Sequence, residues 1–216
     1  RGDTQFTQTD WNPMVDGVFI PRSNAREMQI DSYGHMVYLP ANNGSTWGPI
    51  WARRRSDIDL TQEFISDNGQ DHWGSGTLAA VRNRLQQTRD GLMGLHANVG
   101  ITFDLDAVRT AKSRQIEYLK AVVVNLDSSV GESPSGELPL ADIRVFVDGR
   151  LRYSRLEFGR DDGNAQMVFP LSEYDRFLTI VTTDAGGDPS FDHVVLIDPV
   201  LQLRPEPVAT TRYDVK

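Results

Sequence analysis

The sequence predicts an all-β fold, a β-sandwich with one or two short helices. Short runs of alternating apolar and polar residues recur along the chain, and clusters of turn residues separate them. The Val-Asp-Gly sequence at residues 147–149 lies between two such runs and is typical of a tight β-hairpin. Many short strands with turns at regular intervals favour a sandwich over an α/β fold.

The predicted strands form two groups along the chain, and prolines end two of the early ones where a central strand could not tolerate them. In the first group they span residues 15–21, 28–31, 35–39 and 46–52. In the second group they span residues 101–105, 116–125, 143–147, 151–158, 166–169, 177–183 and 193–203. The intervening segment 127–139 is rich in Ser, Gly, Pro and Glu, which predicts a loop.

Two segments change to a helical period. Leu78, Val81 and Leu85 lie on one helical face between Gly74 and Gly91, which predicts an amphipathic helix that ends at Gly91. Residues 106–112 predict a second helix of one or two turns directly after a strand.

Composition restricts the classes of function. The formal net charge is −8, which argues against nucleic-acid binding. The basic run Arg53-Arg54-Arg55 lies beside acidic residues and is interpreted as a solvated strand end. The chain has no cysteine, which excludes disulfides and thiolate chemistry, and no apolar run long enough to insert into a membrane.

A single β-sandwich domain over residues 1–216 is the preferred organisation. Residues 1–73 are expected to add strands to the same sandwich, because so short a segment without cysteine makes a weak core by itself. Residues 204–216 lose the alternation and are interpreted as a tail. The chain starts with Arg1, not Met, so we expect a mature or excised part of a larger protein.

Four short motifs follow one another in the second half of the chain. They are Gly94-Leu-His96-Ala97, Phe103-Asp-Leu105, Val147-Asp-Gly149, and the loop from Asp184-Ala-Gly to Asp192-His193. In this order they resemble the NPCBM family of carbohydrate-binding modules, a galactose-binding-like jelly roll, over roughly residues 94–203. Members of that family often have an aromatic residue soon after Asp-His, whereas this chain continues Val194-Val-Leu-Ile-Asp198. The resemblance therefore implies no aromatic sugar contact at residues 194–198 of this chain.

The resemblance implies a non-catalytic module that binds a glycan or polysaccharide and forms part of a larger exported bacterial protein. Its location would be extracellular, periplasmic or at the cell surface, with other domains of the parent protein as further partners. Aromatic faces stack on pyranose rings, while amides, imidazoles and guanidinium groups bond the hydroxyls. The candidate carbohydrate-binding residues are Trp47, Trp73, Asn43, Arg53, His96 and His193. The alternative interpretation of the two histidines is that they fix loops to strands, and that of the two tryptophans is that they belong to the core.

Asp184, Asp188 and Asp192 recur every four residues in a loop that also contains Gly186 and Gly187. Such a loop can supply the carboxylate and carbonyl oxygens that calcium prefers, so a structural calcium ion (Ca²⁺) is predicted here. An acidic solvated turn is the alternative.

Two other functions remain open. A protein-interaction or cell-surface module without sugar affinity would show an exposed apolar patch. A glycoside hydrolase would need two carboxylates that face each other across a cleft. The chain has no Gly-x-Ser-x-Gly elbow and no His-Glu-x-x-His motif, so no catalytic residue is proposed and an enzyme is the weaker interpretation.

Overall fold

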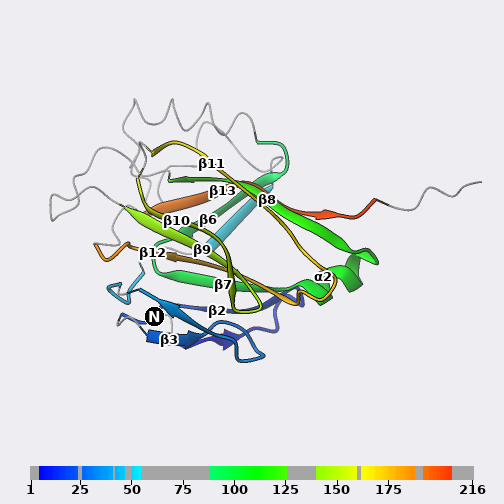
Figure 1. Cartoon of the computed structure of the whole chain (residues 1–216), viewed down its shortest axis with the longest axis horizontal. Helices are drawn as coiled ribbons and strands as arrows, with labels where there is room; N and C mark the ends of the chain where they lie inside the picture. Colours follow the sequence, from blue (N-terminus) through cyan, green and yellow to red (C-terminus); the bar gives the residue numbers. More distant parts are fainter. Residues whose placement is uncertain are drawn as a thin grey trace, which may run out of the picture.

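The computed structural model describes residues 5–23, 26–40, 42–46, 50–54, 88–125, 140–159, 162–187 and 192–205. Two antiparallel sheets face each other (Figure 1). The six-stranded sheet has the order β1 (Thr7–Gln8), β2 (Val15–Phe19), β7 (Val99–Asp104), β12 (Phe177–Thr183), β9 (Ala141–Val147), β10 (Arg150–Phe158). The five-stranded sheet has the order β11 (Ala165–Pro170), β8 (Ile116–Asn125), β13 (His193–Leu203), β6 (Gly91–His96), β5 (Ile50–Arg54).

The main hydrophobic core lies between these sheets. Alternate residues of each strand point into it, as the period of two along a strand requires. Ile101 and Ile180 are paired neighbours from β7 and β12 of the first sheet, and Leu95 and Val194 are paired neighbours from β6 and β13 of the second. The side chains of all four residues are buried.

A second, smaller core lies on the outer face of the six-stranded sheet. The hairpin of β3 (Arg26–Gln29) and β4 (Met36–Leu39) packs its inward residues there, against Phe19, Phe146 and Val181. The buried hydroxyl of Thr102 on β7 bonds the carbonyl oxygen of Ile30, and it lies 2.8 Å from the hydroxyl of Thr179. The hairpin is therefore joined to the sheet by a polar contact as well as by apolar burial.

Helix α2 (Leu105–Lys112) follows β7 without a loop. The carboxylate of Asp104 accepts hydrogen bonds from the backbone N–H groups of Asp106 and Ala107, which satisfies two of the free donors at the helix start. Ser113 ends the helix in the left-handed region, with φ of 52°. Leu105 and Val108 are the apolar residues that the helix buries.

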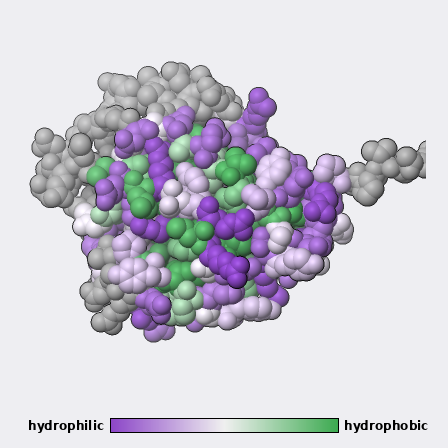
Figure 2. Space-filling view, in the orientation of Figure 1, coloured by the Kyte–Doolittle hydropathy of each residue, from purple (hydrophilic) through white to green (hydrophobic). Residues whose placement is uncertain are grey.

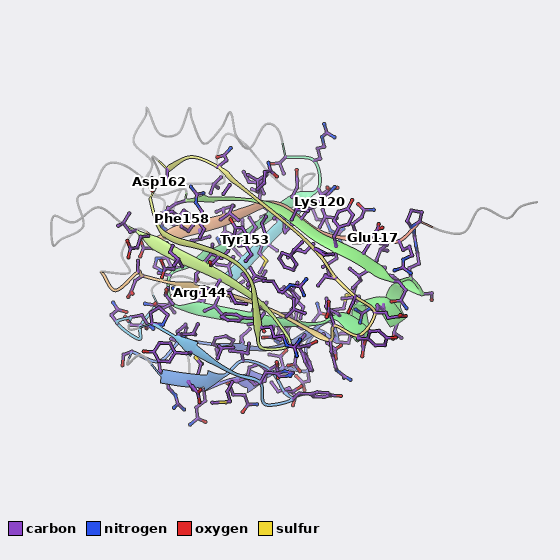
Figure 3. All side chains as sticks on the ribbon, in the orientation of Figure 1. Glu117, Lys120, Arg144, Tyr153, Phe158 and Asp162 are labelled. Carbon is purple, nitrogen blue, oxygen red and sulfur yellow. The ribbon has the colours of Figure 1, made fainter. Side chains whose placement is uncertain are left out.

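Arg155 on β10 connects the two sheets at their edges, since β10 is an edge strand of the first sheet and β11 is an edge strand of the second. The Arg155 guanidinium donates to the carbonyl oxygens of Val123 at 3.2 Å, Gly163 at 3.0 Å and Asp162 at 2.8 Å. It also lies 4.5 Å from the centre of the Phe158 ring. Phe158 and Asp162 mark this edge in Figure 3. Since Val123 belongs to β8, the contact connects the first sheet to the second.

The structure confirms the all-β sandwich, the strands predicted after residue 115 and the helix at residues 106–112. The Asp-Gly hairpin is also confirmed, with positive φ at Asp148 (47°) and Gly149 (74°). The predicted helix over residues 74–91 lies largely outside the described residues, but its predicted end at Gly91 is wrong. Gly91 begins β6, where an added Cβ would lie 2.4 Å from the carbonyl oxygen of Arg53 on β5.

Strands from the first 54 residues lie in both sheets. β1 and β2 extend the six-stranded sheet, and β5 forms one edge of the five-stranded sheet. Among the described residues, no helix has the length and apolarity needed to cross a membrane. The single-domain organisation stays a prediction.

Candidate functional site

Three connecting segments meet at one end of the sandwich. They are Asn42–Thr46 between β4 and β5, Ala97–Asn98 between β6 and β7, and Asp184–Gly187 after β12. We call these segments the loop end. Because β6 and β7 belong to different sheets, the two-residue link Ala97–Asn98 carries the chain from one layer to the other. Asn98 adopts φ of 59°, a conformation that asparagine tolerates better than most residues.

The Asn98 side chain is the centre of the loop end. It is fully buried, and its Nδ2 atom lies 2.9 Å from Oδ2 of Asp184, 2.9 Å from Oδ1 of Asn43 and 2.8 Å from the carbonyl oxygen of Ser45. Its Oδ1 accepts a hydrogen bond from the backbone N–H of Asp184 at 3.2 Å. One side chain therefore contacts both of the other segments. Sequence reasoning missed it, although an Asn after a buried His-Ala turn is a signal for a left-handed turn residue.

Asp184 is 1% exposed, and N–H donors surround its carboxylate. Oδ2 accepts from the backbone N–H of Asn43 at 2.9 Å as well as from Asn98, and Oδ1 accepts from the backbone N–H of Gly186 at 3.0 Å. Hydrogen bonds to a buried carboxylate compensate for the hydration that it loses. The network thereby fixes the position of Asn43 relative to the β-sandwich.

Asn43 is the exposed member of this network. Its Oδ1 accepts from the backbone N–H of Ser45 at 3.0 Å and from Asn98, which orients the amide. Among the described residues, the structure assigns no hydrogen bond to its Nδ2 atom, so two N–H donors are available to a ligand.

His96 and His193 are directly paired neighbours on β6 and β13, next to the loop end. Their rings lie 5.1 Å apart at 88°. His96 is 6% exposed, and burial lowers the pKa of its imidazole below 6.5, opposed by a contact of Nδ1 with the Ala97 carbonyl oxygen at 3.4 Å. The lowered pKa favours a neutral His96 ring, which can donate at one nitrogen and accept at the other.

Trp51 lies on the face of the five-stranded sheet that carries His96 and His193. It pairs with Gly94 on β6, and a Cβ added to Gly94 would lie 2.1 Å from the indole Cε2 atom. The glycine therefore makes room for the indole to lie directly on the strand. Gly94 and His96 are two residues apart and point to the same face, so Trp51 lies on the face that carries the histidine pair.

The structure brings together some of the predicted site residues. Asn43 and Asp184 share the Asn98 network, and the backbone oxygen of Asp192 accepts the N–H of Ala97 at 3.1 Å. Arg53 lies apart from them: it is exposed on β5 opposite Leu92, and its guanidinium contacts the neighbouring Ala52 carbonyl oxygen at 3.2 Å. Trp47, Trp73 and Asp188 lie outside the described residues.

The calcium prediction also stays a prediction. The part of the chain that the structure describes contains no group of three His, Asp or Glu side chains placed to hold a metal ion, and Asp188 is not in that part. Asp184 and Asp192 are both buried. From the described part of the chain, Oδ1 of Asp184 accepts one hydrogen bond, from Gly186, and a carboxylate oxygen has capacity for a further partner.

No family model matches the chain, and no curated protein matches it. Solved structures are similar to it. A CBM51 module of a GH95 protein from Clostridium perfringens, in complex with methyl-galactose, has a TM-score of 0.42 and 16% identity, covering 69% of this chain and 98% of the other. The tandem CBM51 modules of a family 98 glycoside hydrolase from Streptococcus pneumoniae have a TM-score of 0.44 and 20% identity.

A third similar structure contains the CBM51-2 and INT domains of ZmpB from Clostridium perfringens, with a TM-score of 0.41 and 16% identity. The match covers 53% of this chain and 22% of that one. For the tandem CBM51 modules the shares are 56% and 34%. This chain therefore spans about a fifth to a third of the length of those two proteins.

Proposed function

We propose that this chain is a non-catalytic carbohydrate-binding module of the NPCBM type that holds a glycan at the loop end. The observation that carries the proposal is the exposed Asn43 amide, which a buried network of Asn98 and Asp184 holds in place. A donor that is fixed before binding loses little conformational entropy when a sugar hydroxyl accepts from it. The order of the four sequence motifs supports the same proposal.

The loop end offers the two kinds of contact that sugars need. Asn43 supplies amide donors, and His193 adds a half-buried imidazole beside His96. Trp51 is half-buried on the same sheet face, and Trp47 and Trp73 are the other proposed aromatic contacts. We propose Arg53 as a contact further along β5 for a glycan of more than one residue.

The proposed module has no catalytic role. At the loop end, the Asp184 carboxylate is buried and accepts hydrogen bonds from backbone and amide N–H groups, an arrangement that suits a structural role in holding the loops together. We further propose that the parent protein is exported and that its other domains lie beside this module. A structural calcium ion is proposed at Asp184, Asp188 and Asp192, where it would fix the β12–β13 loop.

The experiment that tests the proposal is a glycan-array screen of the purified chain, followed by calorimetric titration with each glycan that binds. Methyl-galactose and GlcNAc are included as free-sugar probes. The variants are Asn43→Ala, His193→Ala, Trp47→Ala and Trp73→Ala. Asn164→Ala is the matched control, because Asn164 is an exposed asparagine in the connection between β10 and β11.

We expect Asn43→Ala to weaken binding by about tenfold, the effect of one or two lost hydrogen bonds, and Asn164→Ala to leave it unchanged. Loss of binding in Trp47→Ala or Trp73→Ala would identify that tryptophan as the aromatic contact of the glycan. If the wild-type chain binds no glycan, the proposed function is wrong. If it binds and the Asn43 and His193 variants bind equally well, the site lies elsewhere.

One observation favours the alternative of a protein-interaction module. Large apolar side chains are exposed on the edge strands β10 and β11: Leu151 is 53%, Leu156 50% and Val168 61% exposed. Figure 2 shows that apolar patches on the viewed face are divided by hydrophilic side chains. Arg150 and Arg152 alternate with Leu151 on β10, which limits the size of any continuous apolar surface there.

A further inference from the structure

A second group of aromatic and planar side chains, with an exposed tyrosine, lies at the opposite end of the six-stranded sheet. Strand β12 runs from Phe177 to Thr183, so Phe177 lies one strand length away from Asp184 and the loop end. Around the buried Phe177 ring lie Tyr33, with ring centres 4.9 Å apart, and His35, with ring centres 6.4 Å apart. The Arg176 guanidinium lies 4.4 Å from the centre of the Tyr33 ring. We call these four residues the Tyr33 cluster.

The Tyr33 ring is exposed and yet held in place. It is 65% exposed, although Arg176 lies over one face and Phe177 meets it at 67°. Its backbone N–H donates to Oδ1 of the buried Asp31 at 3.1 Å, which fixes the turn that carries it. Most of the residue therefore stays open to solvent although two neighbours hold its ring in place. A fixed aromatic face open to solvent is the surface on which the apolar side of a pyranose stacks.

His35 adds an oriented polar group. Its Nδ1 lies 2.7 Å from Oδ2 of Asp31, and its backbone N–H donates to Oδ1 of the same carboxylate at 3.1 Å. The contact at Nδ1 fixes the ring and leaves Nε2 on the opposite side, and the side chain is 36% exposed. Since Asp31 is fully buried, its carboxylate holds His35 rigidly.

Arg176 keeps unused hydrogen-bonding capacity. A guanidinium has five N–H donors. Among the described residues, the side chain of Arg176 makes one hydrogen bond, from Nη2 to Oδ2 of Asp104 at 3.3 Å, and an ion pair with Asp106 at 3.6 Å. Stacking on Tyr33 fixes the plane of the group. Its Nε is buried, so the donors of Nη1 and Nη2 are the ones that can serve a ligand beside the tyrosine ring.

The charge around the cluster selects the class of ligand. Four carboxylates surround it: Asp31 at His35, Asp104 and Asp106 at Arg176, and Asp148, whose carboxylate accepts the backbone N–H groups of Arg176 and Phe177. Arg109, which pairs with Asp106 at 2.6 Å, joins Arg176 and His35 as a basic group here, and these three described residues do not balance the four carboxylates. An acidic or sulfated sugar would be repelled there, whereas an uncharged one would not.

We infer that the Tyr33 cluster is a second saccharide-binding site, specific for uncharged pyranosides, so that the module engages glycans at both ends of the six-stranded sheet. This inference rests on the proposed function. The Tyr33 ring supplies the stacking face, and His35 Nε2 and the Arg176 guanidinium bond the hydroxyls. Two sites on one module would raise the avidity for a branched or clustered glycan.

The test uses the full chain with an array of neutral, sialylated and sulfated glycans, followed by calorimetry with each neutral glycan that binds. The variants are Tyr33→Ala and the loop-end double variant Asn43→Ala with His193→Ala. Tyr38→Ala is the matched control, because Tyr38 is a 63% exposed tyrosine on the same hairpin that contacts neither Arg176 nor Phe177. Backbone amide NMR shifts of Gly34 and Gly149 report on the Tyr33 cluster, and those of Gly186 report on the loop end.

We expect Tyr33→Ala to lose about tenfold or more in affinity for at least one neutral glycan that Tyr38→Ala and the loop-end variant still bind. That glycan should shift the Gly34 and Gly149 amides. If Tyr33→Ala binds every glycan within twofold of wild type, the second site is wrong, whether or not the loop-end variant fails. If the loop-end variant keeps all binding and Tyr33→Ala loses it, the second site stands and the loop-end proposal is wrong. A wild-type chain that binds no glycan overturns both.

Discussion

The buried Asn98 amide and the buried Asp184 carboxylate lie 2.9 Å apart, although 86 residues separate them in the chain. The contact joins the link between the two sheets to the loop that follows β12, and Asn43 completes it from a third segment. Because both groups are buried, the contact contributes to the stability of the fold as well as to the shape of the loop end.

The Asn98→Gly variant tests this contact without adding backbone strain, because glycine adopts φ of 59° freely. We expect the free energy of unfolding to fall by about 2–4 kcal/mol, since the substitution leaves the Asp184 carboxylate buried with fewer donors. Urea denaturation provides the measurement. Asn43→Ala, at the exposed end of the network, should cost less than about 1 kcal/mol. Equal effects of the two substitutions would show that Asn98 is not the centre of the network.

The Gly94→Ala variant tests the close approach of Trp51 to β6. The added Cβ would lie within 2.4 Å of three indole atoms, so the ring must move and the fold should lose about 1–3 kcal/mol. A double-mutant cycle with Trp51→Ala measures the coupling. In the Trp51→Ala background the alanine at position 94 should be nearly neutral. Additive effects would mean that the indole does not lie on Gly94.

The lowered pKa of His96 leads us to expect that the free energy of unfolding depends on pH. Its pKa in the folded protein is lowered below 6.5 by burial, so the unfolded chain binds the proton more readily. This group therefore has little effect on stability about one pH unit or more above 6.5, and stability falls as the pH decreases through 6.5 toward the lowered pKa, by at most about 1.4 kcal/mol per pH unit. The measurement is urea unfolding between pH 5 and 8, compared with His96→Gln, whose decline should be shallower. Parallel curves for the two proteins would contradict the prediction.

Arg155→Ala tests the contact between the two sheets. The substitution removes donors to the carbonyl oxygens of Val123, Gly163 and Asp162, and we expect a loss of about 1–3 kcal/mol in the free energy of unfolding. Arg150→Ala, an exposed arginine on the same strand, is the control and should change stability by less than about 0.5 kcal/mol. A loss of the same size in both variants would assign the effect to net charge instead.

Thermal unfolding in calcium and in a chelator tests the proposed calcium ion, with calcium at about 1 mM, roughly a thousandfold excess over the dissociation constant of a micromolar site. We expect calcium to raise the melting temperature of the wild-type chain and to have no effect on Asp188→Asn. Asp162→Asn, in the connection between β10 and β11, is the control and should keep the response. An equal melting temperature in calcium and chelator would rule out a structural calcium ion.

Much of the fold follows from local pattern. The alternation at 116–125, 177–183 and 193–203 predicts three strands whose bounds agree with the structure, because an antiparallel strand with one face toward the core imposes a period of two on its side chains. The Asp148-Gly149 hairpin follows in the same way from the left-handed backbone that its turn requires. Strand β6 was missed because its residues are buried on both faces, so polar and apolar residues do not alternate along it.

The sequence by itself determined where most strands run, because backbone and burial preferences act over a few residues. Only the tertiary structure decided which side chains share a site. Asn98 contacts Asp184 and Asn43, which are 86 and 55 residues away in the chain. Tyr33, in the hairpin of β3 and β4, contacts Arg176, which directly precedes β12 in the six-stranded sheet. These contacts depend on the order of strands in each sheet and on the hairpin packed against it. Strand order is set by the burial of the whole core, which no local spacing encodes.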